Sequence, residues 1–283
     1  MKNKKIVSIA ALIAASLSAA HAQTIAAWSF ENNSIAVNNS PAPSSGSGTA
    51  SSIGMDLYAT PNIGVTTDDV VLGKSSDTGA NGVANLTQTW RVRAQAGSNG
   101  AANGWSSAAA IGTQGAVFAA STVGYSGSLQ ITFDWYATTQ GEANLQLAYT
   151  TDGSTWINVP ITLGGSDTGL QVLNNTASAN TVVGSYVSDN ILTGGSKAGQ
   201  DWFTGLTATI NDPNAANDAN FAIELVNASA GADCINTQGT ALNNSSGNWR
   251  FDNISIQATP EPTTLALAGL GGLAALVAVR RRK

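Results

Sequence analysis

The chain has 283 residues, of which only 10% are charged, and it carries a formal net charge of −5. The charge is unevenly spread, because residues 23–259 hold five cations and 16 acids, a net of about −11, while seven of the twelve cations lie outside this range. So acidic a segment excludes nucleic-acid binding, which needs Lys and Arg clustered against phosphate.

The first 22 residues predict a signal peptide. Three lysines among the first five residues precede an apolar stretch over 6–17, and Ala20-His21-Ala22 supplies the small residues that signal peptidase requires. We expect cleavage after Ala22 and a mature chain that begins at Gln23. The alternative is an uncleaved anchor, which the Ala-x-Ala site disfavours.

The mature chain would contain no histidine, because the single histidine is His21. This excludes serine triads, Cys-His dyads and histidine zinc sites. The sole cysteine, Cys234, follows Asp233, whose charge disfavours a thiolate, so we expect a buried, inert thiol. A glycosidase needs two carboxylates at a set separation, and no pair stands out in the sequence. We therefore expect no catalytic residue and no enzymatic activity.

Alternation of apolar and polar residues predicts one all-β domain over 23–259, for which some 237 residues suffice. The clearest strand is Leu129–Tyr136. The segments Leu145–Tyr149 and Trp156–Val159, separated by Asp152-Gly153, are expected to complete an antiparallel meander with it. Further strands are expected at Ala26–Phe30, Trp90–Gln95, Ala116–Ala120, Gly205–Ile210, Phe221–Leu225 and Trp249–Ile256.

Two irregular features are expected within this domain. Trp249 and Phe251 have one parity and Ile254 and Ile256 the other, so a bulge near Asp252-Asn253 would bring all four inward. The segment Asn33–Thr60 has little apolar content and predicts a long surface loop. Short strands between polar turns predict an antiparallel β-sandwich of two sheets, jelly-roll-like in its connections.

Residues 260–283 combine three ordered features: the triplet Pro260-Glu261-Pro262, a 17-residue uncharged run over Thr263–Val279, and the cations Arg280, Arg281, Arg282 and Lys283. As a helix the run would span about 25 Å, near the lower limit for crossing a hydrocarbon core of about 30 Å. The cations favour a cytoplasmic end, which places the preceding domain across the membrane. A buried core helix is the alternative.

This arrangement resembles the PEP-CTERM sorting signal of Gram-negative bacteria. The resemblance implies recognition and cleavage near the triplet by exosortase, an integral-membrane cysteine protease or transpeptidase, in bacteria that make exopolysaccharide. It implies an inner-membrane precursor with the N-terminal domain outside the cytoplasm, and a mature form at the cell surface or beyond. The cargo also resembles the β-sandwich domains that often precede this signal, through Asn103–Ser107, Gly115–Phe118, Tyr149–Trp156 and Trp249–Ile254.

Two groups of candidate ligand residues remain in the cargo. Jelly-roll carbohydrate-binding modules often hold a structural calcium between acids on the first and last strands, where Glu31 and Asp252 stand here. The alternative is that both acids are solvated. Four aromatic residues are candidates for stacking on sugar rings, with core packing as the alternative for each of them: Trp105, Tyr125, Tyr136 and Trp202.

The predicted function is a non-enzymatic exported surface or matrix protein, structural or adhesive in the exopolysaccharide layer. The alternative is a calcium-assisted carbohydrate-binding module, and a third reading is a polysaccharide-active enzyme. The expected partners are signal peptidase and exosortase during processing, the membrane around the precursor, and extracellular polysaccharide. We expect no cofactor other than the structural calcium of the alternative reading.

Overall fold

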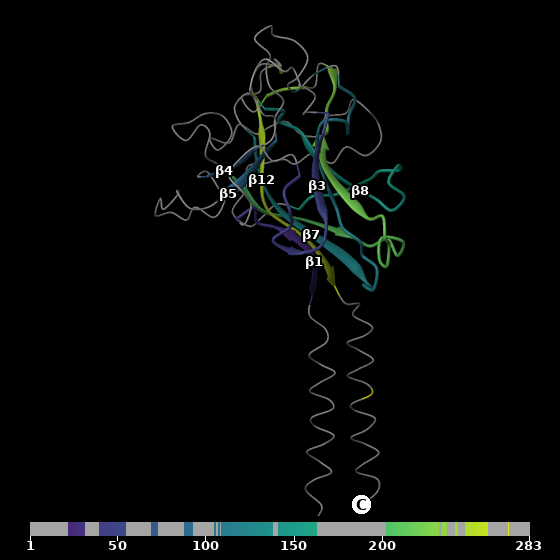
Figure 1. Cartoon of the computed structure of the whole chain (residues 1–283). Helices are drawn as coiled ribbons and strands as arrows, with labels where there is room; N and C mark the ends of the chain where they lie inside the picture. Colours follow the sequence, from purple (N-terminus) through teal and green to yellow (C-terminus); the bar gives the residue numbers. More distant parts are fainter. Residues whose placement is uncertain are drawn as a thin grey trace, which may run out of the picture.

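The computed structural model describes residues 22–31, 40–54, 69–72, 88–92, 105, 107, 109–137, 141–162, 202–231, 234–236, 241–242, 247–259 and 271. These residues form twelve strands in two antiparallel sheets (Figure 1). The predicted signal peptide before Ala22 lies outside the described residues, as does the predicted membrane segment apart from Gly271. Among the helical residues described, none belongs to a helix of the length and apolarity that spanning a bilayer requires.

The larger sheet is built around the last strand of the domain. Its order is β10-β7-β12-β1-β2, and β5 joins the same side of β12 as β1, with β4 outside it. The pairing registers place β5 and β1 end to end along β12, opposite Trp249–Phe251 and Ile254–Ala258 respectively. The strands are β1 (Gln23–Trp28), β2 (Ser45–Gly46), β4 (Asp69–Leu72), β5 (Gln88–Val92), β7 (Ser128–Ala137), β10 (Phe203–Ile210) and β12 (Trp249–Thr259).

The smaller sheet has the order β3-β6-β11-β8-β9. Its strands are β3 (Thr49–Ile53), β6 (Gly115–Ala119), β8 (Leu145–Thr150), β9 (Ile157–Val159) and β11 (Ala222–Asn227). Every strand expected from alternation is present, within a few residues of its predicted bounds. The predicted three-strand meander is wrong for its first strand, because β7 belongs to the larger sheet, whereas β8 and β9 pair antiparallel in the smaller one as expected. Alternation indicates which face of a strand is buried, and both sheets bury one face in the same core.

The predicted surface loop over Asn33–Thr60 is wrong in its central part, which forms β2 and β3. β3 pairs with β6 from Thr49↔Ala119 to Ile53↔Gly115, and Ala50 is fully buried. Backbone hydrogen bonds hold this edge strand in the sheet. Its Ser and Thr side chains do not show the alternation of apolar and polar residues that predicts a strand. Residues 33–39 and 55–60 of the predicted loop lie outside the described residues.

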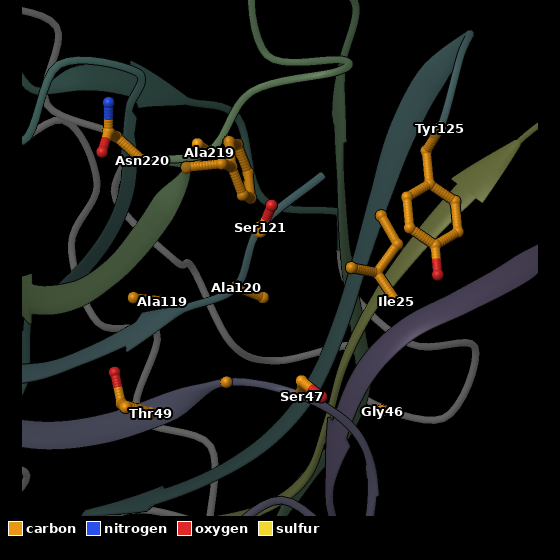
Figure 2. A pocket seen from close by; sticks show the side chains of 12 residues that line it. Ile25, Gly46, Ser47, Thr49, Ala119, Ala120, Ser121, Tyr125, Ala219 and Asn220 are labelled. Carbon is orange, nitrogen blue, oxygen red and sulfur yellow. The ribbon is translucent and has the colours of Figure 1, made fainter. Parts of the chain in front are cut away.

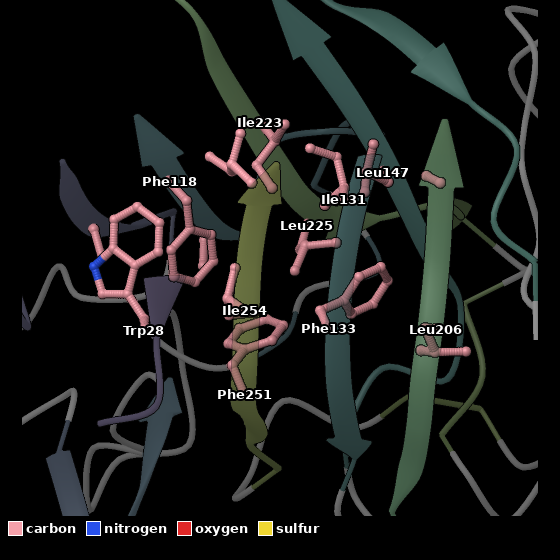
Figure 3. Packing of buried hydrophobic residues seen from close by; sticks show 14 of the residues in the cluster. Trp28, Phe118, Ile131, Phe133, Leu147, Leu206, Ile223, Leu225, Phe251 and Ile254 are labelled. Carbon is pink, nitrogen blue, oxygen red and sulfur yellow. The ribbon is translucent and has the colours of Figure 1, made fainter. Parts of the chain in front are cut away.

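The two sheets face each other across one hydrophobic core, which Figure 3 shows from close by. Phe118 of the smaller sheet contacts three aromatic rings of the larger one: the ring centroids lie 5.2 Å from Trp28, 5.8 Å from Trp90 and 6.0 Å from Phe251. All three contacts are edge-to-face, a favoured geometry for aromatic pairs. Aromatic packing therefore joins the sheets at their centre.

The predicted bulge in the last strand is confirmed. The β12–β7 register shifts between Asp252 and Ser255, and Asn253 has a φ of 49°. Its consequence is the expected one, because the side chains on both sides of the irregularity are fully buried: Trp249, Phe251, Ile254 and Ile256. One extra residue thus lets an 11-residue strand keep its apolar side chains in the core despite the change of parity.

The pairing registers also define the two ends of the domain. Gln23 pairs with Ala258 and Ser128 pairs with Thr259, so the start of β1 and the end of β12 meet at one end. The connections β2–β3, β6–β7, β8–β9 and β10–β11 lie at this end as well, which we call the terminal pole. The opposite end, where β12 begins at Trp249, is the distal pole.

Candidate functional site

The final strand remains paired on both sides up to its last residues. Ala258 is opposite Gln23 of β1 on one side and Leu129 of β7 on the other. Thr259 pairs with Ser128, and its hydroxyl donates a hydrogen bond of 2.9 Å to the Ser128 carbonyl oxygen. Pro260 is the next residue in the sequence. The Pro-Glu-Pro triplet therefore follows a fixed strand with no intervening linker.

A hollow of about 460 Å³ opens at the terminal pole (Figure 2). Its volume lies within the range of about 300–1,000 Å³ that is usual for small-ligand sites. No lining side chain carries a charge. The lining comes from Ile25 of β1, the sheet-to-sheet crossing over 46–49, residues 119–121 at the end of β6, Tyr125, and residues 219–221 before β11. We call this hollow the polar groove, after the hydroxyl and amide groups of its Ser, Thr, Tyr and Asn side chains; Ile25, three alanines and Phe221 make much of the remaining lining apolar.

Two glycines allow the crossing that forms one wall of the polar groove. Gly46 has a φ of 75°, and a Cβ built on it would overlap the carbonyl oxygen of Ile25. A Cβ on Gly48 would lie 2.6 Å from the Ala119 carbonyl oxygen and 2.9 Å from the Trp28 ring. Only glycine fits such close approaches, so the chain passes between the sheets without filling the groove.

Tyr125 is the predicted sugar-stacking residue that the structure places in this groove. Its side chain is partly exposed and packs against the edge of the core. It also lines a second hollow of about 290 Å³, formed with residues 126–128, Asn211, Pro213, Ala216 and Asn217. The Tyr125 N–H donates to the Thr122 carbonyl over 3.0 Å, and the Thr122 hydroxyl donates to Ala215 over 2.7 Å. The two neighbouring connections thus hold the ring between two hollows.

The other three aromatic candidates lie towards the distal pole. Trp105 is 1% exposed, and its ring centroid is 4.3 Å from that of Trp249, so it packs in the core. Tyr136 is buried beside the partly exposed Trp202 at 5.7 Å, and the Arg250 guanidinium carbon lies 5.7 Å from the Tyr136 ring centroid. The four residues therefore do not form a single stacking platform.

Glu31 and Asp252, the predicted calcium ligands, lie at the seam where β1 and β5 meet along β12. Glu31 Oε1 accepts a hydrogen bond of 2.7 Å from the Gln88 N–H at the start of β5. Asp252 is fully buried and is the cross-strand partner of Asp134. The described residues contain no group of three or more His, Cys, Asp or Glu side chains arranged to hold a metal ion. Calcium binding stays a prediction.

Sequence reasoning missed a buried polar cluster at the distal pole, which we call the Glu142 cluster: Glu142, Asn144, Ser229 and Cys234. Glu142 Oε1 accepts from the Asn144 N–H at 3.0 Å, the Asn144 Nδ2 at 2.8 Å and the Ser229 hydroxyl at 2.9 Å. Burial has the largest effect on the Glu142 carboxyl and raises its pKa to about 7, although these hydrogen bonds act to lower it. The cluster members are up to 92 positions apart in the sequence, so no local pattern could have identified them.

Cys234 is 2% exposed, which confirms the expectation of a buried thiol. Its sulfur lies 3.5 Å from the Ser229 hydroxyl oxygen, and Glu142 is a further neighbour of the thiol. A nearby carboxyl group disfavours a thiolate. The Trp249 indole N–H donates to the Glu142 carbonyl over 2.7 Å. The cluster thus fixes loop backbone to the start of β12.

Residues 258–283 match the PEP-CTERM protein-sorting motif. The match confirms the resemblance seen in the tail and supports sorting by exosortase to the cell surface from a membrane-anchored precursor. It begins within the last two residues of β12, so the signal and the folded sheet share Ala258 and Thr259. No curated protein matches the chain. The role of the β domain itself must therefore be inferred from its own residues.

Proposed function

We propose that the protein is a non-enzymatic surface or extracellular-matrix protein, exported by its signal peptide and structural or adhesive in the exopolysaccharide layer. The observation that carries this proposal is the direct continuity between β12 and the sorting motif. Because no linker separates them, exosortase acts on a tail attached to the centre of a folded sheet. The folded domain is therefore the cargo that sorting delivers.

The chemistry of the described residues supports a role without catalysis. The two carboxyl groups whose pKa burial raises to about 7, Glu142 and Glu224, line neither hollow. The polar groove contains hydroxyl, amide and aromatic groups, which bind ligands but do not supply a general base at neutral pH. The mature chain would also lack histidine.

We further infer that the cargo is a β-sandwich with jelly-roll-like connections. At the terminal pole the connections β2–β3, β6–β7 and β10–β11 cross between the facing sheets, and β8–β9 joins neighbouring strands of the smaller sheet. β1 lies next to β12. Neighbouring first and last strands are common in such sandwiches. The single aromatic core between the sheets supports the same architecture.

Sorting is tested by replacing Glu261 and Pro262 with Ala and, separately, Arg280, Arg281 and Arg282 with Ala in the native host. We expect uncleaved precursor to accumulate in the membrane fraction and surface protein to fall at least tenfold. Ser154→Ala, in an exposed turn, is the matched control. Unchanged processing and surface levels in both variants would contradict the proposal.

A second candidate function is carbohydrate binding through the polar groove, and the position of Tyr125 favours it. An uncharged groove with one partly exposed ring suits a neutral sugar unit, whose apolar face stacks on the ring while hydroxyls bond to Ser121 and Asn220. Glycan-array binding by the mature chain tests this function. Tyr125→Ala should weaken binding at least tenfold, whereas the exposed neighbour Val123→Ala should not. Measurements with calcium and with chelator test whether the ion assists.

A further inference from the structure

We propose that the membrane covers the polar groove in the anchored precursor and that cleavage of the sorting signal uncovers it, so that glycan binding follows sorting. This inference rests on the second candidate function and on the membrane-anchored precursor that the sorting motif implies. Cleavage would then do more than release the domain from the membrane. It would also open the polar groove to ligand.

The polar groove and the sorting signal lie at the same pole of the domain. Ile25 in the groove wall is two residues from Gln23, which pairs with Ala258. Tyr125 is three residues before Ser128, which pairs with Thr259. At about 3.3 Å per residue along a strand, Ile25 lies about 7 Å from the end of the sheet. The groove therefore opens close to the point where Pro260 leaves the fold.

The tether to the membrane is short because β12 is paired to its last residue. Four peptide steps separate Thr259 from Thr263, where the apolar run begins, and these span at most about 14 Å. The polar zone of each leaflet is about 5–8 Å deep, from the difference between total and hydrocarbon thickness. Even a fully extended tether therefore leaves the terminal pole no more than about 6–9 Å from the headgroups. The groove lining lies at this pole, so we infer that the narrow gap excludes a polysaccharide strand from the groove.

Closure depends on the tether and not on attraction to lipid. Asp212 and Asp218 belong to the same pole, and they do not attract an anionic leaflet. The groove lining is uncharged. Lengthening the tether should therefore be sufficient to open the groove. A Gly-Ser linker of about 20 residues has a root-mean-square span of about 25 Å, enough to lift the pole clear of the headgroups.

The test compares full-length precursor in nanodiscs with the same precursor carrying that linker between Thr259 and Pro260. A thiol is introduced in the groove by Ser47→Cys or at the distal pole by Ala110→Cys, both at exposed positions. The probe is a polyethylene-glycol maleimide. We expect the Ser47→Cys variant to react at least tenfold more slowly without the linker and the Ala110→Cys variant to react equally in both. The parent chain, whose Cys234 is buried, measures background.

Equal rates for the Ser47→Cys variant with and without the linker would overturn the closure. The labelling needs no sugar, so its result is independent of the glycan proposal. In a second arm, nanodisc-bound precursor, linker precursor and mature chain are tested for binding to the glycan array. Slow labelling combined with no glycan binding by the mature chain would overturn the glycan function alone. Glycan binding by the short-tethered precursor at the affinity of the mature chain would overturn the inferred order of events.

Discussion

Ser229 donates a hydrogen bond of 2.9 Å to Glu142 across 87 residues of sequence, and both side chains are almost fully buried. The bond joins the connection after β11 to the segment that precedes β8. Because the same carboxyl oxygen also accepts from Asn144, one acid organises two loops at the distal pole. Its protonation state therefore affects the stability of that end of the domain.

We predict that Glu142→Gln reduces the loss of stability between about pH 4.5 and pH 7. The pKa of Glu142 is about 7 in the folded protein, against 4.5 for the ordinary group, so the native state keeps a proton that the unfolded state loses. Stability therefore falls as pH rises through this window, by at most roughly 3 kcal/mol at about 1.4 kcal/mol per pKa unit. A glutamine oxygen accepts the same hydrogen bonds without ionising.

Urea unfolding at pH 5 and pH 8 measures this effect. The free energy of unfolding of the variant should differ less between the two pH values than that of the parent. The variant should gain more stability over the parent at pH 8 than at pH 5. Burial also raises the pKa of Glu224 to about 7, so part of the pH dependence should remain in Glu142→Gln and disappear only in the double variant with Glu224→Gln. An identical pH dependence in parent and Glu142→Gln would rule the explanation out.

Phe118→Ala should be among the most destabilising substitutions in the domain. The ring contacts Trp28, Trp90 and Phe251 across the sheet interface and is fully buried, so its removal leaves a cavity between the sheets. The expected cost is about 3–5 kcal/mol in the free energy of unfolding. Chemical denaturation measures it, with Val123→Ala at a 55% exposed position as the control. A cost under about 1 kcal/mol would mean that Phe118 does not join the sheets.

Asn253→Val should destabilise the domain more than Asn253→Gly. A φ of 49° is accessible to glycine and tolerated by asparagine, but it is costly for a β-branched residue. Both variants lose the hydrogen bond of 3.0 Å from the Asn253 side chain to Asp134, so that loss cancels in their comparison, and the greater freedom of glycine in the unfolded chain acts against the expected difference. We expect a difference of roughly 1–2 kcal/mol by thermal or urea unfolding. Equal stability of the two would show that the bulge relaxes.

The calcium prediction is tested through thermal midpoints with calcium and with chelator. If Glu31 and Asp252 hold the ion, calcium should raise the midpoint of the parent, and Glu31→Ala should abolish the rise. The quantity compared is the difference between the two conditions, because Asp252→Ala alone removes a buried group and lowers stability regardless of metal. A parent midpoint independent of calcium would end the prediction.

Local patterns in the sequence identify most strands, because strands such as β7 and β10 alternate between buried and less buried positions over much of their length. They also identified the β12 bulge, since the parity change at Asp252-Asn253 has few other physical explanations. They failed for β3, whose pairing depends on backbone groups, and for the sheet to which β8 belongs, which depends on contacts far away in sequence. The Glu142 cluster shows the same limit.

The candidate groove was predictable only in part. Tyr125 was one of four aromatic residues whose surroundings the sequence left open, and burial distinguishes it from Trp105 and Tyr136. The groove itself depends on Gly46 and Gly48, whose role appears only when the crossing chain is seen against Ile25 and Ala119. The sorting motif needed no structure, because its three features are consecutive in the chain.

The position of β12 between β1 and β7 has a consequence for biogenesis. The strand that completes the centre of the larger sheet is the last part of the domain to be synthesised, and β1 waits for a neighbour more than 220 residues downstream. Pairing over such separations is slow. β1 and β12 can therefore pair only after the whole domain has been synthesised, and until then the larger sheet lacks its central strand.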